Sequence, residues 1–247
     1  MSLWVNWDTV DLKVKLKRIL ENLTGIQFFR NSLPRGVDVA RDICRIYSKD
    51  LYEIWDIGAH KGETAAYFRT RFPKPVIRSF EPISENYQTL KQNCSSLPNH
   101  YVYNLALGDE IKSMIIHLQN ASVIHSLRPD LNQPSSSNPR TENIKQTTVD
   151  SLFQKFNCQK IDILKIDVEG YEKSVLKGAE YCLENKLINF IYLETGLDDR
   201  FNSIQSIIDT LGPHGYSPYG FYEQTAHWTG TENLWYWNSL FVNKKLL

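Results

Sequence analysis

Cysteine is scarce in this sequence, and its four copies stand far apart among 247 residues. They form no C-x-x-C pair and no histidine stands at zinc-site spacing, so structural zinc is not expected. Isolated thiols in a chain of this length are typical of a reduced, cytoplasmic protein. The four are Cys44, Cys94, Cys158 and Cys182.

A surplus of charge of either sign is also absent. Lys plus Arg and Asp plus Glu both number 28, so the formal net charge is zero. No general attraction to nucleic acid or to an anionic membrane follows, and nucleic acid is not an expected partner. Runs as long as a transmembrane helix and a signal-peptide pattern are lacking too, which again favours a cytoplasmic location.

The middle of the chain alternates apolar strands with helices. Strands over 52–57, 76–80 and 101–105 enclose helices over 64–71 and 84–93, an order typical of a doubly wound parallel sheet. A strand over 161–166 and a helix over 172–185 continue the pattern. The remaining elements are a strand at 188–193, a helix at 203–211, and antiparallel strands near 216–222 and 239–242.

Two parts of the chain stand apart from this alternation. Residues 8–24 have one apolar helical face and several basic residues; such a helix can lie on a membrane, but we expect packing on the core. We therefore expect an N-terminal helical extension over 1–50, packed on a single domain over 51–247.

Short strands at 113–118 and 144–149 enclose a polar loop whose length is typical of disordered or functional segments.

A glycine turn follows the first strand of the domain. Its pattern is Asp56-x-Gly58-x-x-x-Gly62, in which Gly58 lets the chain turn and Gly62 lets the next helix begin close to a ligand. The pattern lacks the G-x-G-x-x-G fingerprint of dinucleotide sites and the Lys-[Ser/Thr] of a phosphate loop. Buried turns need glycine for packing alone, so the turn does not assign a function by itself.

Four strands end in a carboxylate: Asp56, Glu81, Asp167 and Glu194. The carboxyl ends of parallel strands meet at one edge of the sheet, where ligands bind. Glu81 follows the glycine turn by about 20 residues, the separation expected for an acid that accepts hydrogen bonds from ribose hydroxyls. Acids without a phosphate cradle favour a nucleoside that carries positive charge, and S-adenosylmethionine fits that description.

Several blocks of sequence resemble FkbM-type methyltransferases. The most specific is 163–172, Ile-Leu-Lys-Ile-Asp-Val-Glu-Gly-Tyr-Glu, and the resemblance extends from about residue 52 to 195 in the family's order. The other blocks are 55–59 with Gly62, 80–82, 106–108, 148–152 and 175–179. His60 departs from the pattern, because the family more often has Asn there.

The resemblance implies a class I methyltransferase fold, Rossmann-like, with a seven-stranded sheet, an antiparallel last strand and helices on both faces. It also implies S-adenosylmethionine as methyl donor and O-methylation, commonly of sugar or polyketide hydroxyls. The expected acceptor is therefore a small molecule or a glycan.

Six residues besides Glu81 are expected to bind the cofactor. Gly58 and Gly62 admit it, Asp56 orients its methionine ammonium, and His60 touches its methionine end. Asp109 approaches the adenine amino group, and Asp167 closes the pocket.

The catalytic base is expected among Asp167, Glu169, Lys165 and His227. Asp167 and Glu169 could instead anchor the acceptor, or form half of a Mg²⁺ site that Glu194 completes. The plainer alternative is that Glu169 caps the next helix. Lys165 could act as a base if burial lowers its pKa, although an ion pair with a carboxylate is expected.

Other parts of the sequence leave further alternatives open. His125 and His227 lie in predicted loops, where histidine is often only solvated. Aromatic residues of 228–237 could stack on the acceptor or fill the core. A dinucleotide-dependent oxidoreductase and a non-catalytic nucleoside-binding module are the competing functions.

Overall fold

The computed structural model describes residues 12–26, 33–118, 140–197, 202–226 and 234–247. The chain divides into two compact units, Met1–Arg35 and Gly36–Leu247. The first contains helix α1 (Leu12–Thr24). The second contains every other element, so α2 (Val39–Ile46), which we had assigned to the extension, lies in the larger unit. The predicted domain boundary at residue 50 stays a prediction.

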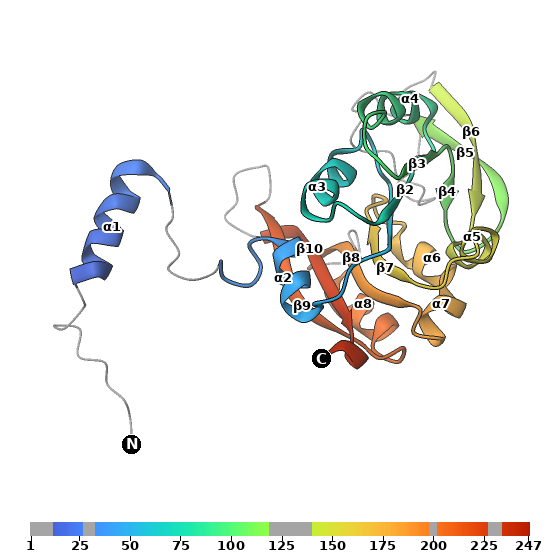
Figure 1. Ribbon diagram of the computed structural model, residues 1–247. Coiled ribbons are helices and arrows are strands. Elements are labelled where there is room, and N and C mark those ends of the chain that lie inside the picture. Colours follow the sequence, from blue (N-terminus) through green and yellow to red (C-terminus); the bar gives the residue numbers. More distant parts are fainter. Residues whose placement is uncertain (1–11, 27–32, 119–139, 198–201, 227–233) are drawn as a thin grey trace. The chain divides into compact units, whose positions relative to one another are not determined.

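A seven-stranded sheet with the order β3-β2-β1-β7-β8-β10-β9 forms the centre of the larger unit (Figure 1). The last strand, β10, is antiparallel to both of its neighbours, whereas β1 is parallel to β2 and β7. The predicted class I sheet is therefore confirmed. Its strands are β1 (Glu53–Ile57), β2 (Val76–Phe80), β3 (His100–Tyr103), β7 (Ile161–Ile166), β8 (Ile188–Gly196), β9 (Tyr216–Ala226) and β10 (Leu234–Asn243).

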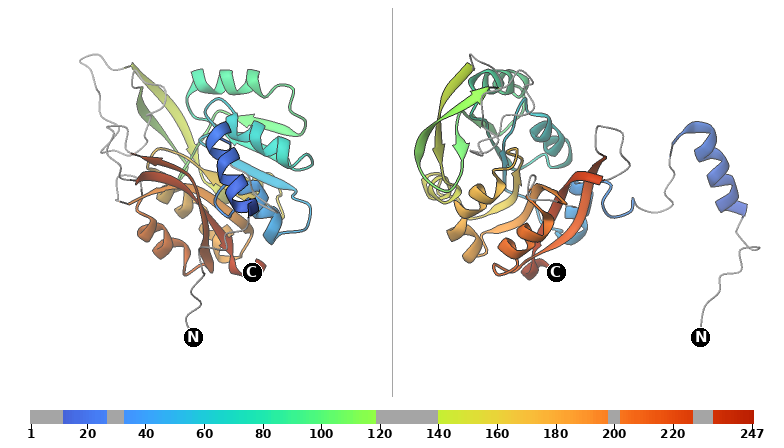
Figure 2. Two further views of the ribbon diagram at one scale, coloured as in Figure 1. Left: turned by 90° about the vertical axis from the view of Figure 1, so that its left-hand side faces the viewer. Right: turned by 180° about the vertical axis from the view of Figure 1, so that it is seen from behind.

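Helices cover both faces of this sheet (Figures 1 and 2). Alternate residues of a strand point to opposite faces, so Ile54 and Trp55 belong to different core clusters. The Ile54 cluster receives side chains from α2, α3 (Glu63–Arg71) and α4 (Ser84–Asn93). The Trp55 cluster receives them from α5 (Val149–Lys155), α6 (Glu172–Lys177), α7 (Glu180–Glu184) and α8 (Ile204–Leu211).

A second, three-stranded sheet is built from β4 (Ala106–Leu107), β5 (Lys112–Leu118) and β6 (Arg140–Thr147). β5 and β6 are antiparallel, as expected for the predicted pair of short strands. The pair packs through Ile116 and Ile144 against Ile83 and Ala106, which places this sheet beside the chain that leaves β2.

Several predicted elements have a different extent in the structure, and for two of them the local contacts give the reason. The strand expected over 144–149 ends at Thr147, because Thr148 accepts a hydrogen bond from the Ser151 backbone and begins α5. The helix expected over 172–185 is divided into α6 and α7. The break lies at Gly178, where any Cβ would overlap the Gly108 carbonyl oxygen, so the chain passes too close to another loop for a side chain.

The four cysteines are free thiols, as expected. Within the described ranges, no helix is both long enough and apolar enough to cross a membrane.

Candidate functional site

A cavity of about 180 Å³ lies at the carboxyl ends of β1, β2 and β7, the edge of the sheet where ligands were expected. Its walls come from the glycine turn, from the chain after β2, from residues 105–107 and from the turn after β7. The lining residues are Ile57, Gly58, His60, Phe80, Glu81, Pro82, Ile83, Asn86, Leu105, Ala106, Leu107, Asp167, Val168 and Glu169.

The two glycines of the turn differ in what they contact. Gly58 has a φ of 76°, lines the cavity, and leaves no room for a Cβ beside the Asp167 carbonyl oxygen. Gly62 has a φ of 96°, and a Cβ there would overlap the sulfur of Cys94. Gly58 therefore brings the turn against β7, whereas Gly62 lets α3 begin against α4 and is not part of the cavity lining.

His60 also adopts the left-handed backbone conformation, with a φ of 48°. Asn and His are among the residues that tolerate this conformation, which gives a structural reason for either residue here. The His60 backbone N–H donates a hydrogen bond of 3.0 Å to Glu81. Its ring lines the cavity, and Nε2 is buried without a partner among the described residues.

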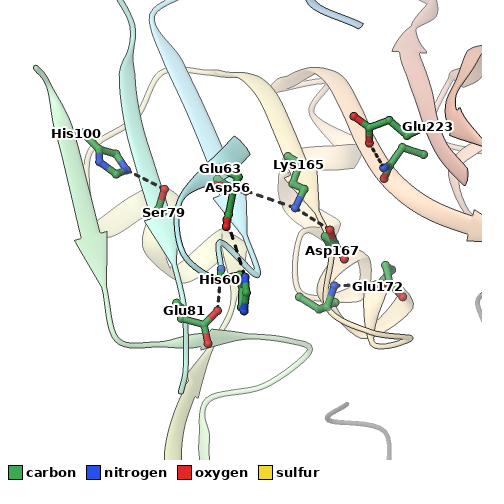
Figure 3. Close-up of polar contacts among 12 residues, drawn as sticks. Asp56, His60, Glu63, Ser79, Glu81, His100, Lys165, Asp167, Glu172 and Glu223 are labelled. Atoms are coloured by element: carbon green, nitrogen blue, oxygen red, sulfur yellow. Dashed lines mark hydrogen bonds and ion pairs between the residues drawn. The ribbon is translucent and has the colours of Figure 1, made fainter. Parts of the chain in front are cut away.

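Glu81 is held in a fixed position at the end of β2 (Figure 3). One carboxylate oxygen accepts from the His60 backbone and the other from the Ile83 backbone, each at 3.0 Å. Burial raises the pKa of Glu81 to about 7, although these backbone donors oppose the shift. Each oxygen keeps a further lone pair, so the carboxylate can accept two hydroxyl donors from a ligand in the cavity.

Asn86 is a cavity residue that the sequence reading missed. It lies in the first turn of α4, is 6% exposed, and lines the cavity together with Glu81, whose pKa its amide lowers. No pattern in the sequence marked it, because a polar residue in a helix is ordinarily solvated.

Asp109 is not among the residues that line the cavity. It accepts a hydrogen bond of 3.0 Å from the Ser174 hydroxyl and pairs with Lys177 at 3.3 Å. Burial works to raise the pKa of Asp109, but these two partners outweigh it and leave the pKa below its ordinary value. In the structure this carboxylate joins the loop after β4 to α6. Its contact with adenine stays a prediction.

Lys165 lies in β7 and links two acids (Figure 3). Its ammonium nitrogen is 3.0 Å from Asp167 and 3.6 Å from Asp56, and only 6% of its side chain is exposed. Burial alone would lower the pKa of Lys165, but the two carboxylates outweigh it and raise the pKa. Lys165 therefore holds its proton, and the ion pair expected from the sequence is present.

Asp56 itself is fully buried and is not among the residues that line the cavity. Neither of its carboxylate oxygens has a hydrogen-bond partner among the described residues, so the Lys165 ammonium is the group that compensates its charge. Asp167 is more accessible, with 35% of its side chain exposed, and it lines the cavity.

The turn after β7 carries a third acid into the cavity lining, Glu169. Its φ is 52°, and burial together with Asp167 and Glu172 raises its pKa to about 8. The capping role considered for Glu169 is not seen, because α6 has no side-chain cap hydrogen bond. The Glu172 carboxylate instead stabilises the turn before the helix by accepting from the backbone N–H groups of Val168 and Gly170.

Several sequence candidates are placed elsewhere. His125, His227 and Trp228 lie outside the described residues. Trp237 is buried, packs edge-on against Phe221 and donates to Ser239, so it fills the core of the last strands. In the part of the chain that the structure describes, no three His, Cys, Asp or Glu side chains converge in a way that could hold a metal ion.

The chemistry of the lining fits a nucleoside that carries positive charge. Three carboxylates line the cavity, and no lysine or arginine of the described residues does. Glu81 presents two fixed acceptors, as ribose hydroxyls require, while the His60 ring has a buried nitrogen without a partner among the described residues. S-adenosylmethionine has the matching groups: ribose hydroxyls, a sulfonium and an ammonium.

Comparison with known proteins agrees with this geometry. Residues 56–218 match the family described as the Methyltransferase FkbM domain. The hexuronic acid methyltransferase AglP of Haloferax volcanii is 27% identical over 165 residues, which are 65% of this chain and 64% of AglP. The 2-O-methyltransferase NoeI of Sinorhizobium fredii is 23% identical over 209 residues, 79% of this chain and 84% of NoeI.

Solved structures with a similar course of the chain have lower sequence identity to it. An rRNA methylase of Streptococcus thermophilus has a TM-score of 0.49 and 8% identity, covering 83% of this chain and 93% of that one. TrmK of M. capricolum, in complex with S-adenosylhomocysteine, has a TM-score of 0.47 and 9% identity, covering 83% of this chain and 67% of that one.

Proposed function

Because the chain belongs to the FkbM methyltransferase family, and is thus an S-adenosylmethionine-dependent methyltransferase, we propose that it methylates a hydroxyl of a sugar or glycan. The names of two relatives support this choice of acceptor over a polyketide, since one methylates a hexuronic acid and the other is a 2-O-methyltransferase. The dinucleotide-dependent oxidoreductase is set aside, because neither the glycine spacing nor the family supports it.

The cofactor would be held by residues of the glycine turn after β1 and by the acids at the carboxyl ends of the strands. Glu81 accepts hydrogen bonds from the ribose hydroxyls, and Gly58 and His60 border the methionine part. Asp56 and Asp167 supply negative charge toward the methionine ammonium. When bound, the cofactor supplies an electrophilic methyl group; positioning of the acceptor is the protein's main contribution.

One observation carries the proposed reaction: Asp167 and Glu169 line the same cavity as Glu81. Asp167 is held in place by Lys165 and is suited to anchoring the acceptor. Glu169, whose pKa burial raises to about 8, is suited to taking the proton of the acceptor hydroxyl at near-neutral pH. Lys165 is then a positioning residue, because a raised pKa keeps it from acting as a base.

The experiment is methyl transfer from isotope-labelled S-adenosylmethionine to a panel of methyl glycosides, followed by chromatography of the sugars. We expect labelled O-methyl sugar with at least one glycoside, and no product with the matching deoxy sugar. If S-adenosylhomocysteine binds but no hydroxyl acceptor gains the label, the non-catalytic nucleoside-binding alternative is favoured and the proposed O-methylation is wrong.

A further inference from the structure

Three polar residues of the last strands share the sheet face that carries Lys165. Lys165 is the register partner of Asp56 on β1 and of Tyr192 on β8. Glu194 stands two residues after Tyr192 and is directly opposite Asn238 of β10. Paired residues, and residues two apart in a strand, point to the same face. Tyr192, Glu194 and Asn238, which we call the polar shelf, therefore continue the row formed by Asp56, Lys165 and Asp167.

The polar shelf has hydrogen-bonding groups without partners. Tyr192 is 4% exposed, and its hydroxyl lies close to the Glu223 carboxylate, which adds to burial in raising its pKa. Asn238 donates through Nδ2 to Glu223, a carboxylate that can only accept, which fixes the amide orientation. Its Oδ1 is buried and lacks a donor among the described residues.

Glu194 completes the polar shelf with a carboxylate. It is half-buried and has no hydrogen bond or ion pair with another described residue. Together the three side chains present an amide oxygen that needs a donor, and a carboxyl group and a hydroxyl that can each donate or accept. Sugar hydroxyls are both donors and acceptors, so a polyol satisfies all three groups, whereas an apolar acceptor leaves them unpaired.

The charges around Glu194 are mostly negative. Burial, then Asp167, Glu169 and Glu172, raise its pKa to about 9, and Lys165 is the cation that opposes them. That lysine already lies within ion-pair distance of two other carboxylates. β10 contributes the neutral Asn238, and β9 contributes Glu223, a further acid. A ligand that brings its own carboxylate would add a like charge to this group without a free cation among the described residues to meet it.

We infer that Tyr192, Glu194 and Asn238 bind the acceptor and that they select a neutral polyol over a sugar that carries a carboxylate. The inference rests on the proposed function and names its acceptor class; the polar shelf continues the sheet face of Lys165 and is not part of the cavity lining. It also distinguishes this chain from the relative whose name specifies a hexuronic acid.

Two methyl glycosides that differ only at C6 provide the test: methyl β-D-glucopyranoside and methyl β-D-glucuronopyranoside. Each is titrated by calorimetry into the full chain saturated with S-adenosylhomocysteine, at about pH 7 and about pH 9.5. We expect the glucoside to bind more tightly, with the preference reaching about tenfold, or 1.4 kcal/mol, at the higher pH, where Glu194 loses its proton.

Two variants connect that preference to the polar shelf. Glu194→Gln should cancel the rise in preference between the two pH values, because it removes the charge that appears there. Asn238→Leu should weaken glucoside binding about fivefold at both pH values, through loss of one hydrogen bond. S-adenosylhomocysteine affinity should not change in either variant. The matched control is Glu184→Gln, an exposed glutamate on α7, which should bind both sugars as the wild type does.

The inference is overturned if the two glycosides bind equally, if the glucuronide binds more tightly, or if neither binds. It is also overturned if the Asn238→Leu variant binds the glucoside as the wild type does. Sugar binding without methyl transfer would count against the proposed reaction and leave the polar shelf standing. If a glycoside is methylated but its affinity is the same in the wild type and in both variants, the result would count against the polar shelf alone.

Discussion

The ammonium nitrogen of Lys165 lies 3.0 Å from a carboxylate oxygen of Asp167. The same nitrogen is 3.6 Å from the fully buried Asp56, so one lysine compensates a buried acid and orients another acid that lines the cavity. These two carboxylates explain why a lysine is buried in an otherwise apolar strand.

Replacement of this lysine should be costly for the fold. Lys165→Met keeps the length of the side chain but leaves Asp56 buried without a counter-charge, which should lower the free energy of unfolding by about 3 kcal/mol. Urea unfolding followed by circular dichroism measures the change. The double variant Lys165→Met/Asp56→Asn should recover part of the loss; a single variant as stable as the wild type would show that the pair is not needed.

Glu169 should set the pH dependence of methyl transfer. A general base acts when deprotonated, so kcat should rise with pH through the pKa of about 8 that burial and neighbouring acids give this residue. The positive charge of bound cofactor shifts that rise to lower pH. Glu169→Gln should lower kcat about 100-fold and remove the rise. The same profile in Glu169→Gln and wild type would assign the base elsewhere, with His227 the next candidate.

Stability of the ligand-free protein should fall as pH increases. Burial raises the pKa of Glu81 and Glu172 to about 7, of Glu169 to about 8 and of Glu194 to about 9, all above the ordinary value of 4.5. The folded state therefore binds more protons than the unfolded state above about pH 4.5, and stability declines with pH until these groups ionise in the folded protein.

Thermal melts between about pH 5.5 and 9 measure this decline. The double variant Glu169→Gln/Glu194→Gln provides the control and should show a shallower decline, because two of the four acids no longer titrate. A midpoint that stays constant or rises over this range would contradict the burial of these carboxylates.

The group of acids at one edge of the sheet could be predicted from the sequence, because local patterns show where each parallel strand ends. Asp56, Glu81 and Asp167 each end an apolar strand, and the edge where they meet is fixed once the strands are parallel. Asp109 also follows a strand, yet its partner Ser174 is 65 residues away, and no local pattern indicates that contact. In the same way, no local pattern indicates that Glu169 adopts the left-handed conformation or that the Glu172 carboxylate accepts from the backbone of Val168 and Gly170.

The polar shelf shows the other limit of sequence reasoning. Glu194 was visible as the end of a strand, but its partner across the sheet, Asn238, lies in an aromatic segment whose register could not be predicted. Antiparallel pairing of distant strands depends on the whole sheet rather than on neighbours in sequence. Side chains that bind an acceptor in this way become recognisable only after the strands are paired.

Binding of the S-adenosylmethionine ribose by Glu81, in the cavity at the end of β2, is the assignment on which the other roles depend. It is measured by calorimetric titration of the full chain with S-adenosylhomocysteine, and with NAD as control. We expect binding of the first ligand only, and a loss of at least about 100-fold in Glu81→Ala, because two hydrogen bonds to a carboxylate disappear. Far-ultraviolet circular dichroism of the variant should remain that of the wild type. Unchanged affinity in a folded Glu81→Ala variant, or no binding by the wild type, would contradict it.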